Sequence, residues 1–132
     1  MERRRGPAPA DVLFRATMTG IGGGCRYEGG DVVLSYALDI ALVPGPAAVA
    51  TDTALALPWF VAVADPSGAV IDKQLFELRG EAPAPGRPRV VVERLEQRIR
   101  GVSPAEGPRW RIYFGFELDP EEARARLRER AR

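Results

Sequence analysis

Hydrophobic and polar residues alternate most regularly between Asp31 and Val43. A period of two places successive side chains on opposite faces of an extended chain, so this segment predicts a β-strand with one buried face. The sequence Pro44-Gly45-Pro46 then ends the strand. The predicted buried set consists of Val32, Leu34, Tyr36, Leu38, Ile40 and Leu42.

A second regular alternation runs from Arg109 to Leu118 and predicts another strand. The sequence Asp119-Pro120-Glu121-Glu122 follows it and supplies an N-cap, a proline at the first helical position and acidic residues in the first turn. We therefore expect a short C-terminal helix that begins near Pro120. The apolar side of the strand carries Trp110, Ile112, Phe114, Phe116 and Leu118.

The segment from Trp59 to Leu78 predicts a β-hairpin. It contains two runs that are rich in β-branched and aromatic residues, and the sequence Asp65-Pro66-Ser67-Gly68 joins them. Asp65 suits the first position of a type I turn, and Pro66 fixes the backbone angle that the second position needs. Each of these residues is therefore explained by the turn without any chemical role.

Other segments carry weaker patterns. Residues 11–19 predict a strand with Leu13 facing inward, and the glycine-rich residues 20–24 are interpreted as a flexible turn or bulge. Residues 49–57 fit a strand or a helix, and Pro58 would separate them from the hairpin. Residues 89–99 also fit both elements, but their β-branched start favours a strand.

These segments amount to six or seven strands joined by turns that are rich in proline and glycine. Strands and helices do not alternate, so the pattern predicts an all-β fold, an antiparallel two-sheet sandwich of immunoglobulin-like or related topology. A closed barrel is the alternative. Residues 1–10 are charged and proline-rich and predict a disordered or loosely docked arm, followed by a single domain over residues 11–132.

The composition of the chain excludes several kinds of catalytic and metal-binding site. The chain has 19 Lys and Arg against 18 Asp and Glu, so no strong field points to a nucleic-acid partner. It has no histidine and a single cysteine, Cys25. The usual general base, the commonest metal ligand and every Ser-His or Cys-His pair are therefore missing. We expect a protein that is not an enzyme and that uses no cofactor or metal.

Several residues are of types that can form a chemical site. The glycine-rich segment lacks the Gly-Lys-Ser/Thr ending of a phosphate loop. Cys25 fits an unpaired, partly buried thiol better than a reactive or lipidated one. Asp65, Asp72 and Glu77 are of the right type for calcium or for acid–base catalysis, but a turn and a solvated sheet face explain them. The alternate arginines after Pro120 fit a solvated helix end better than a phosphate or lipid-headgroup site.

Three aromatic residues, Trp59, Trp110 and Tyr113, form the predicted ligand or partner surface. Aromatic side chains on alternating strands are more often part of the core, so both interpretations stay open.

Three blocks of the chain together resemble a known family. They are residues 18–27, residues 60–68 with Lys73 and Phe76, and residues 113–122. In this order they resemble the small uncharacterised putative lipoproteins of alphaproteobacteria over about residues 11–122. The resemblance implies an exported protein of the periplasm or cell envelope and no catalytic residues. It also implies peripheral membrane association through a lipid anchor whose signal and attachment box this sequence lacks.

The expected function is therefore that of a non-catalytic accessory or scaffold protein that binds another protein through a sheet face or an edge strand. A module that binds a small molecule or glycan is the alternative, and a hydrolase based on carboxylates is a further one. The sequence does not indicate the oligomeric state.

Overall fold

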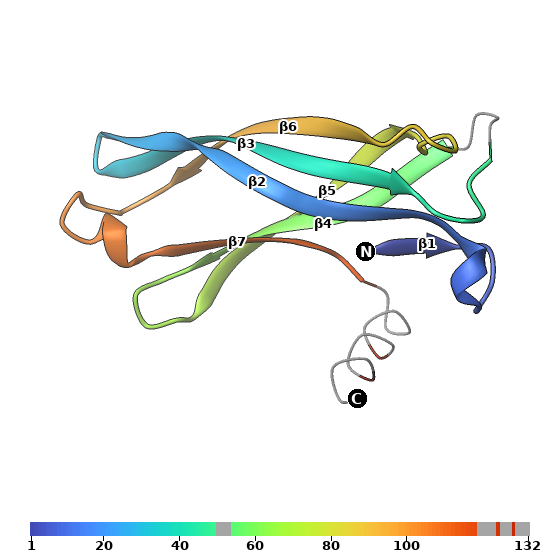
Figure 1. Cartoon of the computed structure of the whole chain (residues 1–132). Coiled ribbons are helices and arrows are strands. Elements are labelled where there is room, and N and C mark those ends of the chain that lie inside the picture. The colour runs from blue at the N-terminus through green and yellow to red at the C-terminus, as the bar shows by residue number, and fades with distance from the viewer. Residues whose placement is uncertain (50–53, 119–123, 125–127, 129–132) are drawn as a thin grey trace.

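The computed structural model describes residues 1–49, 54–118, 124 and 128, and these fold into two antiparallel β-sheets. Sheet A has the strand order β1-β2-β3-β6, and sheet B has the order β5-β4-β7. The sheets lie face to face (Figure 1), which confirms the predicted all-β sandwich. The strands are β1 (Glu2–Arg4), β2 (Val12–Glu28), β3 (Asp31–Pro44), β4 (Ala54–Ala64), β5 (Val70–Glu81), β6 (Arg89–Ile99) and β7 (Arg111–Phe116). Two short 3-10 helices, Pro9–Asp11 and Gly107–Arg109, lie in the connections.

The core lies between the two sheets and follows the predicted alternation of β3. Leu38, Ile40 and Leu42 are completely buried, and they belong to the same apolar cluster as Leu57 and Trp59 of β4. Burial of such side chains stabilises each by about 1.5–3 kcal/mol relative to exposure. Both sheets therefore depend on one shared core.

The predicted hairpin is confirmed as β4 and β5. The Gly68 amide donates to the Asp65 carbonyl oxygen at 2.9 Å, which closes the turn. The Asp65 carboxylate accepts bonds from the Ser67 amide at 2.9 Å, the Ser67 hydroxyl at 2.5 Å and the Ala69 amide at 3.1 Å. The Ser67 hydroxyl is the main reason that the pKa of Asp65 lies below its usual value. Asp65 is thus a turn-forming residue.

We expect Asp65 to make folding depend on pH. Because the folded state lowers the pKa of Asp65, the contribution of its carboxylate to stability is present above the unfolded pKa of about 3.9. That contribution is lost as the pH falls through the lower folded-state pKa. Urea unfolding from pH 7 downwards should show it, and Asp65→Asn should remove this part of the pH dependence. Equal acid sensitivity in both proteins would contradict the assignment.

The prediction that Pro58 separates residues 49–57 from the hairpin is wrong. Pro58 lies inside β4, which begins at Ala54, while residues 50–53 lie outside the described part of the chain. The Pro58 carbonyl oxygen accepts a bond from the Glu117 amide at 2.9 Å, just beyond the end of β7. In a strand, the N–H and C=O groups of one residue point to the same side, so the N–H that Pro58 lacks would also face β7. The paired residues of β4 and β7 end at Trp59 and Phe116, so no hydrogen bond within this pairing is lost. The strand therefore tolerates proline at this position.

The glycine-rich segment is also corrected. Residues 20–24 are not a turn but lie within β2, which pairs with β3 from Phe14 to Glu28. The predicted bulge is present between Met18 and Gly20. The chain reverses instead at Gly29-Gly30, where both φ angles are positive (56° and 84°), as a two-residue hairpin turn requires.

The inward face of β2 also differs from the prediction. Val12, Phe14 and Ala16 are buried, whereas Leu13 is only half-buried. The true phase of the alternation is therefore shifted by one residue from the predicted one.

The N-terminal residues do not form a disordered or loosely docked arm. Glu2–Arg4 pairs with β2 as β1, and the Met1 side chain is buried in the core. The Glu2 carboxylate lies between Arg15 and Arg4, at 2.7 Å and 2.6 Å. Hydrogen bonds first from Arg15 and then from Arg4 hold the pKa of Glu2 below its usual value. Composition predicted disorder here because the partners of these residues are distant in sequence.

The remaining strand predictions are confirmed. Residues 89–99 form β6 rather than a helix, and β7 lies within residues 109–118. On β7, Ile112, Phe114 and Phe116 pack against the core, as the alternation predicts. The predicted C-terminal helix lies mostly outside the described residues and stays a prediction.

Candidate functional site

The structure does not bring the three predicted aromatic residues to one surface. Trp59 is 1% exposed and stacks on Phe76 at 4.7 Å between ring centroids, so it belongs to the core. Trp110 is half-buried and packs on a smaller cluster, where its buried indole N–H has no acceptor within the described residues. Only Tyr113 is open to solvent, at 53% exposure. A ligand surface made of all three is therefore not assembled.

The other candidates also stay apart. Asp72 and Glu77 point to opposite faces of β5, because their partners on β4 are Val63, which is buried in the core, and Pro58. Among the residues that the structure describes, no three Asp, Glu, Cys or His side chains converge on a point. Cys25 is exposed and unpaired, which corrects the expectation that it is partly buried.

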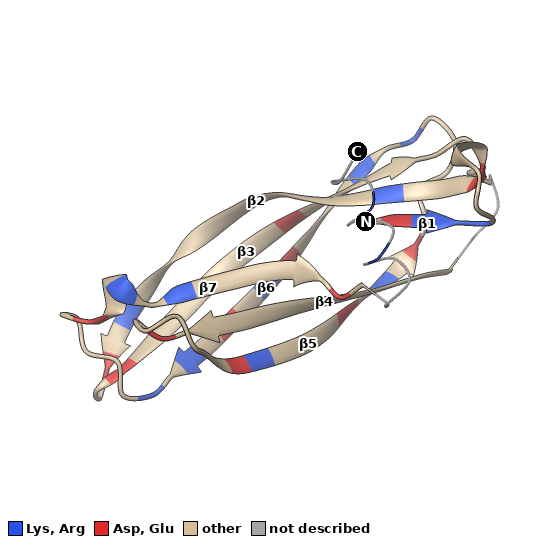
Figure 2. Ribbon diagram, turned by 90° about the horizontal axis from the view of Figure 1, so that it is seen from below, with Lys and Arg blue, Asp and Glu red and all other residues tan. Residues whose placement is uncertain are grey.

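A candidate site that the sequence did not single out lies on the outer face of sheet B, the face turned away from sheet A. Strand register places Leu75 of β5, Phe60 of β4 and Gly115 of β7 in one row across the sheet. The adjacent row runs from Lys73 through Ala62 to Tyr113. Figure 2 shows that β4 carries no charged residue and that β7 carries charge only near its start. The middle of this face is therefore apolar.

Phe60 occupies the centre of this face. A Cβ atom at position 115 would come within 2.7 Å of the Phe60 ring, so the ring lies over the space that Gly115 leaves open. The Lys73 ammonium lies 4.7 Å from the centre of the same ring, within the range of a cation–π contact. Lys73 also forms a 2.9 Å ion pair with Glu117. These contacts link β5 and β7 across β4 and hold Phe60 in place.

We call Phe60, Leu75 and Tyr113 the sheet B patch. Leu75 and Tyr113 are 63% and 53% exposed, and Phe60 is half-buried. A hollow of about 390 Å³ between β2 and β7 borders Tyr113 on one side. Exposed apolar residues that occur singly need no explanation, but a contiguous group on one face is typical of an interaction site. The patch is therefore the strongest candidate for binding.

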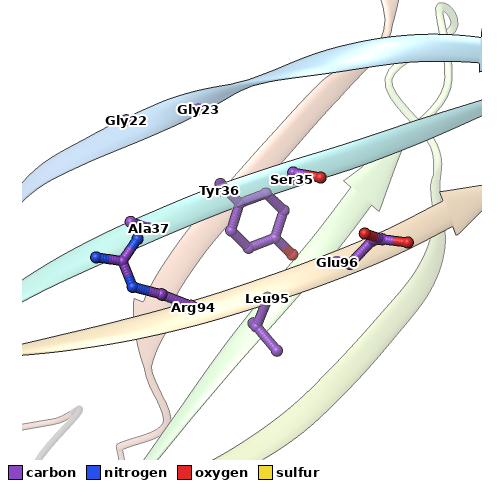
Figure 3. Close-up of a pocket in the computed structure, with 8 residues that line it drawn as sticks. All are labelled: Gly22, Gly23, Ser35, Tyr36, Ala37, Arg94, Leu95 and Glu96. Carbon is purple, nitrogen blue, oxygen red and sulfur yellow. The ribbon is translucent and has the colours of Figure 1, made fainter.

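Sheet A carries a different surface, a hollow of about 550 Å³ on its outer face. Small residues line it on the side of β2 and β3, namely Gly22 and Gly23 of β2 and Ser35 and Ala37 of β3. Figure 3 shows Arg94 and Glu96 of β6 along the side opposite β2. Tyr36 lies at the base, and its hydroxyl donates to Gln97 Oε1 at 3.1 Å. Burial raises the pKa of Tyr36, so its phenol stays protonated at neutral pH.

A group of charged side chains covers the end of sheet A next to this hollow. Register places Arg26 and Arg98 on either side of Val33, which is only 2% exposed although it points away from the core. The arginine stems explain this burial, because long charged side chains can cover apolar surface. Ion pairs hold the two arginines there: Arg26 with Glu28 (2.5 Å) and Glu96 (3.6 Å), and Arg98 with Asp31 (3.0 Å) and Glu28 (4.0 Å).

Within the described residues, no helix is both long and apolar enough to cross a membrane. Comparison of the chain with models of protein families, with curated proteins and with solved structures gives no match.

Proposed function

We propose that this protein is a non-catalytic binding domain that holds a protein partner on the sheet B patch. The observation that carries this proposal is the contiguous apolar surface that Phe60, Leu75 and Tyr113 form across three strands. An extended sheet that presents aromatic and aliphatic groups can bury them against the apolar surface of a partner. An accessory or scaffold role would follow from such a surface.

The chemistry of the patch favours a partner with an apolar centre and a polar edge. The Lys73–Glu117 ion pair crosses the patch, so a partner must accommodate both a cation and an anion beside the Phe60 ring. Arg111 and Glu77 lie on the same face in the flanking rows, where they can form rim contacts. A protein surface provides this mixture of groups.

The cellular setting of this role rests on the resemblance to envelope lipoproteins. We propose on that ground that the protein acts in the periplasm or at the cell envelope, with peripheral membrane association through a lipid anchor. No nucleic-acid partner is proposed, because positive and negative charges are almost equal in number.

Photo-cross-linking in the cells that make the protein tests the proposal. A photoreactive amino acid replaces Leu75 or Tyr113 in turn, and the matched control replaces Tyr27, an exposed aromatic residue on sheet A. We expect one and the same protein to be cross-linked from both patch positions and not from position 27. Absence of a common product, or equal cross-linking from position 27, would contradict the proposal.

Binding of the purified partner then gives a quantitative prediction. Leu75→Glu places a charge in the apolar centre of the interface, so we expect the dissociation constant to rise roughly tenfold or more. Val43→Glu changes an exposed apolar residue of β3 in sheet A, away from the patch, and should leave the constant unchanged. Calorimetric titration measures both values, and equal losses in the two variants would argue against this surface.

A further inference from the structure

β6 presents a long unpaired edge. It is the terminal strand of sheet A in the described fold, and Figure 1 shows it along the upper rim of that sheet. Antiparallel geometry directs every second pair of backbone N–H and C=O groups of β6 away from β3. These groups extend over 11 residues, whereas β1 at the opposite edge has only 3. Such an edge is a template for another strand.

We propose that two copies of this chain pair along β6 in antiparallel orientation, with a two-fold axis at Leu95. The two copies of sheet A then form one continuous sheet. On its outer face, Arg94 lies opposite the partner's Glu96, and by symmetry Glu96 lies opposite the partner's Arg94. Directly opposite residues in an antiparallel pair have Cβ atoms about 4.5–5.5 Å apart, which allows an ion pair.

The sequence of β6 favours this register over its neighbours. An axis at Glu93, Arg94 or Glu96 places the residue on the axis opposite its own copy, which brings like charges together. An axis at Gln97 places Arg94 opposite the partner's Arg100. With the axis at Leu95, no like charges face each other and two attractive pairs form. This arrangement is self-complementary, as a two-fold interface requires.

The residues concerned are available for such contacts. Arg94 is exposed and makes no hydrogen bond or ion pair to any other described residue. Within the described part of the chain, Glu96 has only a 3.6 Å ion pair with Arg26. On the inner face, the half-buried Leu95 lies opposite its own copy, and Val91 lies opposite the partner's Ile99. The apolar core would therefore continue across the axis.

The other long edge, β5, fits a second copy less well. Three of its charged residues already have partners within the chain, since Glu77 pairs with Arg79 at 2.7 Å and Lys73 pairs with Glu117 at 2.9 Å. The ladder between β4 and β5 also shifts register at the Val63–Ala64 end, opposite Ile71. Bulges and an edge lysine are features that keep edge strands from pairing. β5 therefore provides a matched control.

Sedimentation velocity of the full chain, over concentrations up to about 1 mM, tests for the dimer. Hydrogen exchange measured at both ends of this range identifies the strand. We expect dimers whose formation slows amide exchange in Arg89–Ile99 and leaves Val70–Glu81 unchanged. A monomer at every concentration would overturn the proposal, and so would protection confined to β5 or to the sheet B patch.

Charge reversal tests the register. Arg94→Glu and Glu96→Arg each bring like charges together in the dimer, so each alone should raise the dimer dissociation constant at least tenfold. Mixing the two variants should restore dimers, because each then meets the opposite charge. Arg79→Glu on β5 is the control and should leave dimerisation unchanged. Failure of the mixture to restore dimers would overturn the proposed register. The Leu75→Glu variant tests the protein partner on sheet B separately, so a negative result there would leave the β6 dimer unaffected.

Discussion

Replacing Gly23 with alanine should destabilise the protein by about 2–4 kcal/mol, because the structure leaves no room for a side chain. Gly23 lies inside β2 with φ at +148°, in a region that other residues rarely adopt. A Cβ atom there would lie against the Ser35 carbonyl oxygen and 2.7 Å from Tyr36 Cα. Both atoms belong to the backbone of β3, so neither can move without disturbing the sheet.

Gly22 is the matched control for this substitution. It is the preceding residue of the same strand, and a Cβ atom there has no neighbour within 4 Å. Gly22→Ala should therefore leave the free energy of unfolding unchanged or raise it slightly, since alanine loses less conformational entropy on folding. Urea unfolding followed by circular dichroism measures both variants. Equal stability of the two proteins would show that the close approach of β2 and β3 does not constrain Gly23.

The same glycines show where sequence patterns stop being informative. β3 and β7 could be located because large apolar side chains occupy every second position. Glycine has no side chain that could display such a period, so the pattern in the sequence ends near Thr19 although β2 continues to Glu28. The adjacent glycines at 29 and 30 are the sequence signal that could have located the true turn.

The sheet B patch could not be predicted for a different reason. Phe60 lies in an uninterrupted apolar run, in which the period of two disappears and no face can be assigned. Leu75 and Tyr113 become its neighbours only through the registers of β4 with β5 and with β7. Register across three strands depends on long-range pairing, which a single sequence does not specify locally. Of the patch residues, only Tyr113 belongs to the ligand or partner surface that the sequence predicts.

The role of the charged surface residues also depends on neighbours across the sheet. The arginines and glutamates of β2 and β6 suggest a solvated face when each strand is considered alone. Across the sheet they bury Val33 and leave Arg94 without a partner among the described residues. Ion pairs as exposed as these contribute little to stability, about 0–1 kcal/mol each. Their stronger effect would be on specificity, because a like-charge contact disfavours the neighbouring registers of β6 that are centred on Glu93, Arg94, Glu96 or Gln97.

Replacing Trp59 with alanine should have the largest effect on stability, a loss of about 3–5 kcal/mol. Trp59 is the largest of the fully buried side chains, and its ring stacks on Phe76 in the core that both sheets share. Alanine would remove these contacts and leave a cavity that the paired strands around it cannot close. A loss of this size is a large part of the 5–15 kcal/mol that stabilises a typical domain.

Two variants separate this effect from a general sensitivity to the loss of aromatic residues. Trp59→Phe keeps a ring next to Phe76 and should cost clearly less than alanine. Tyr113→Ala removes a half-exposed ring from the outer face of the same sheet and should change the free energy of unfolding by no more than about 0.5 kcal/mol. Urea unfolding followed by circular dichroism applies to all three, because it does not depend on Trp59 fluorescence. Similar losses for Trp59→Ala and Tyr113→Ala would mean that Tyr113 supports the fold, and its place in a binding surface would then lose its basis.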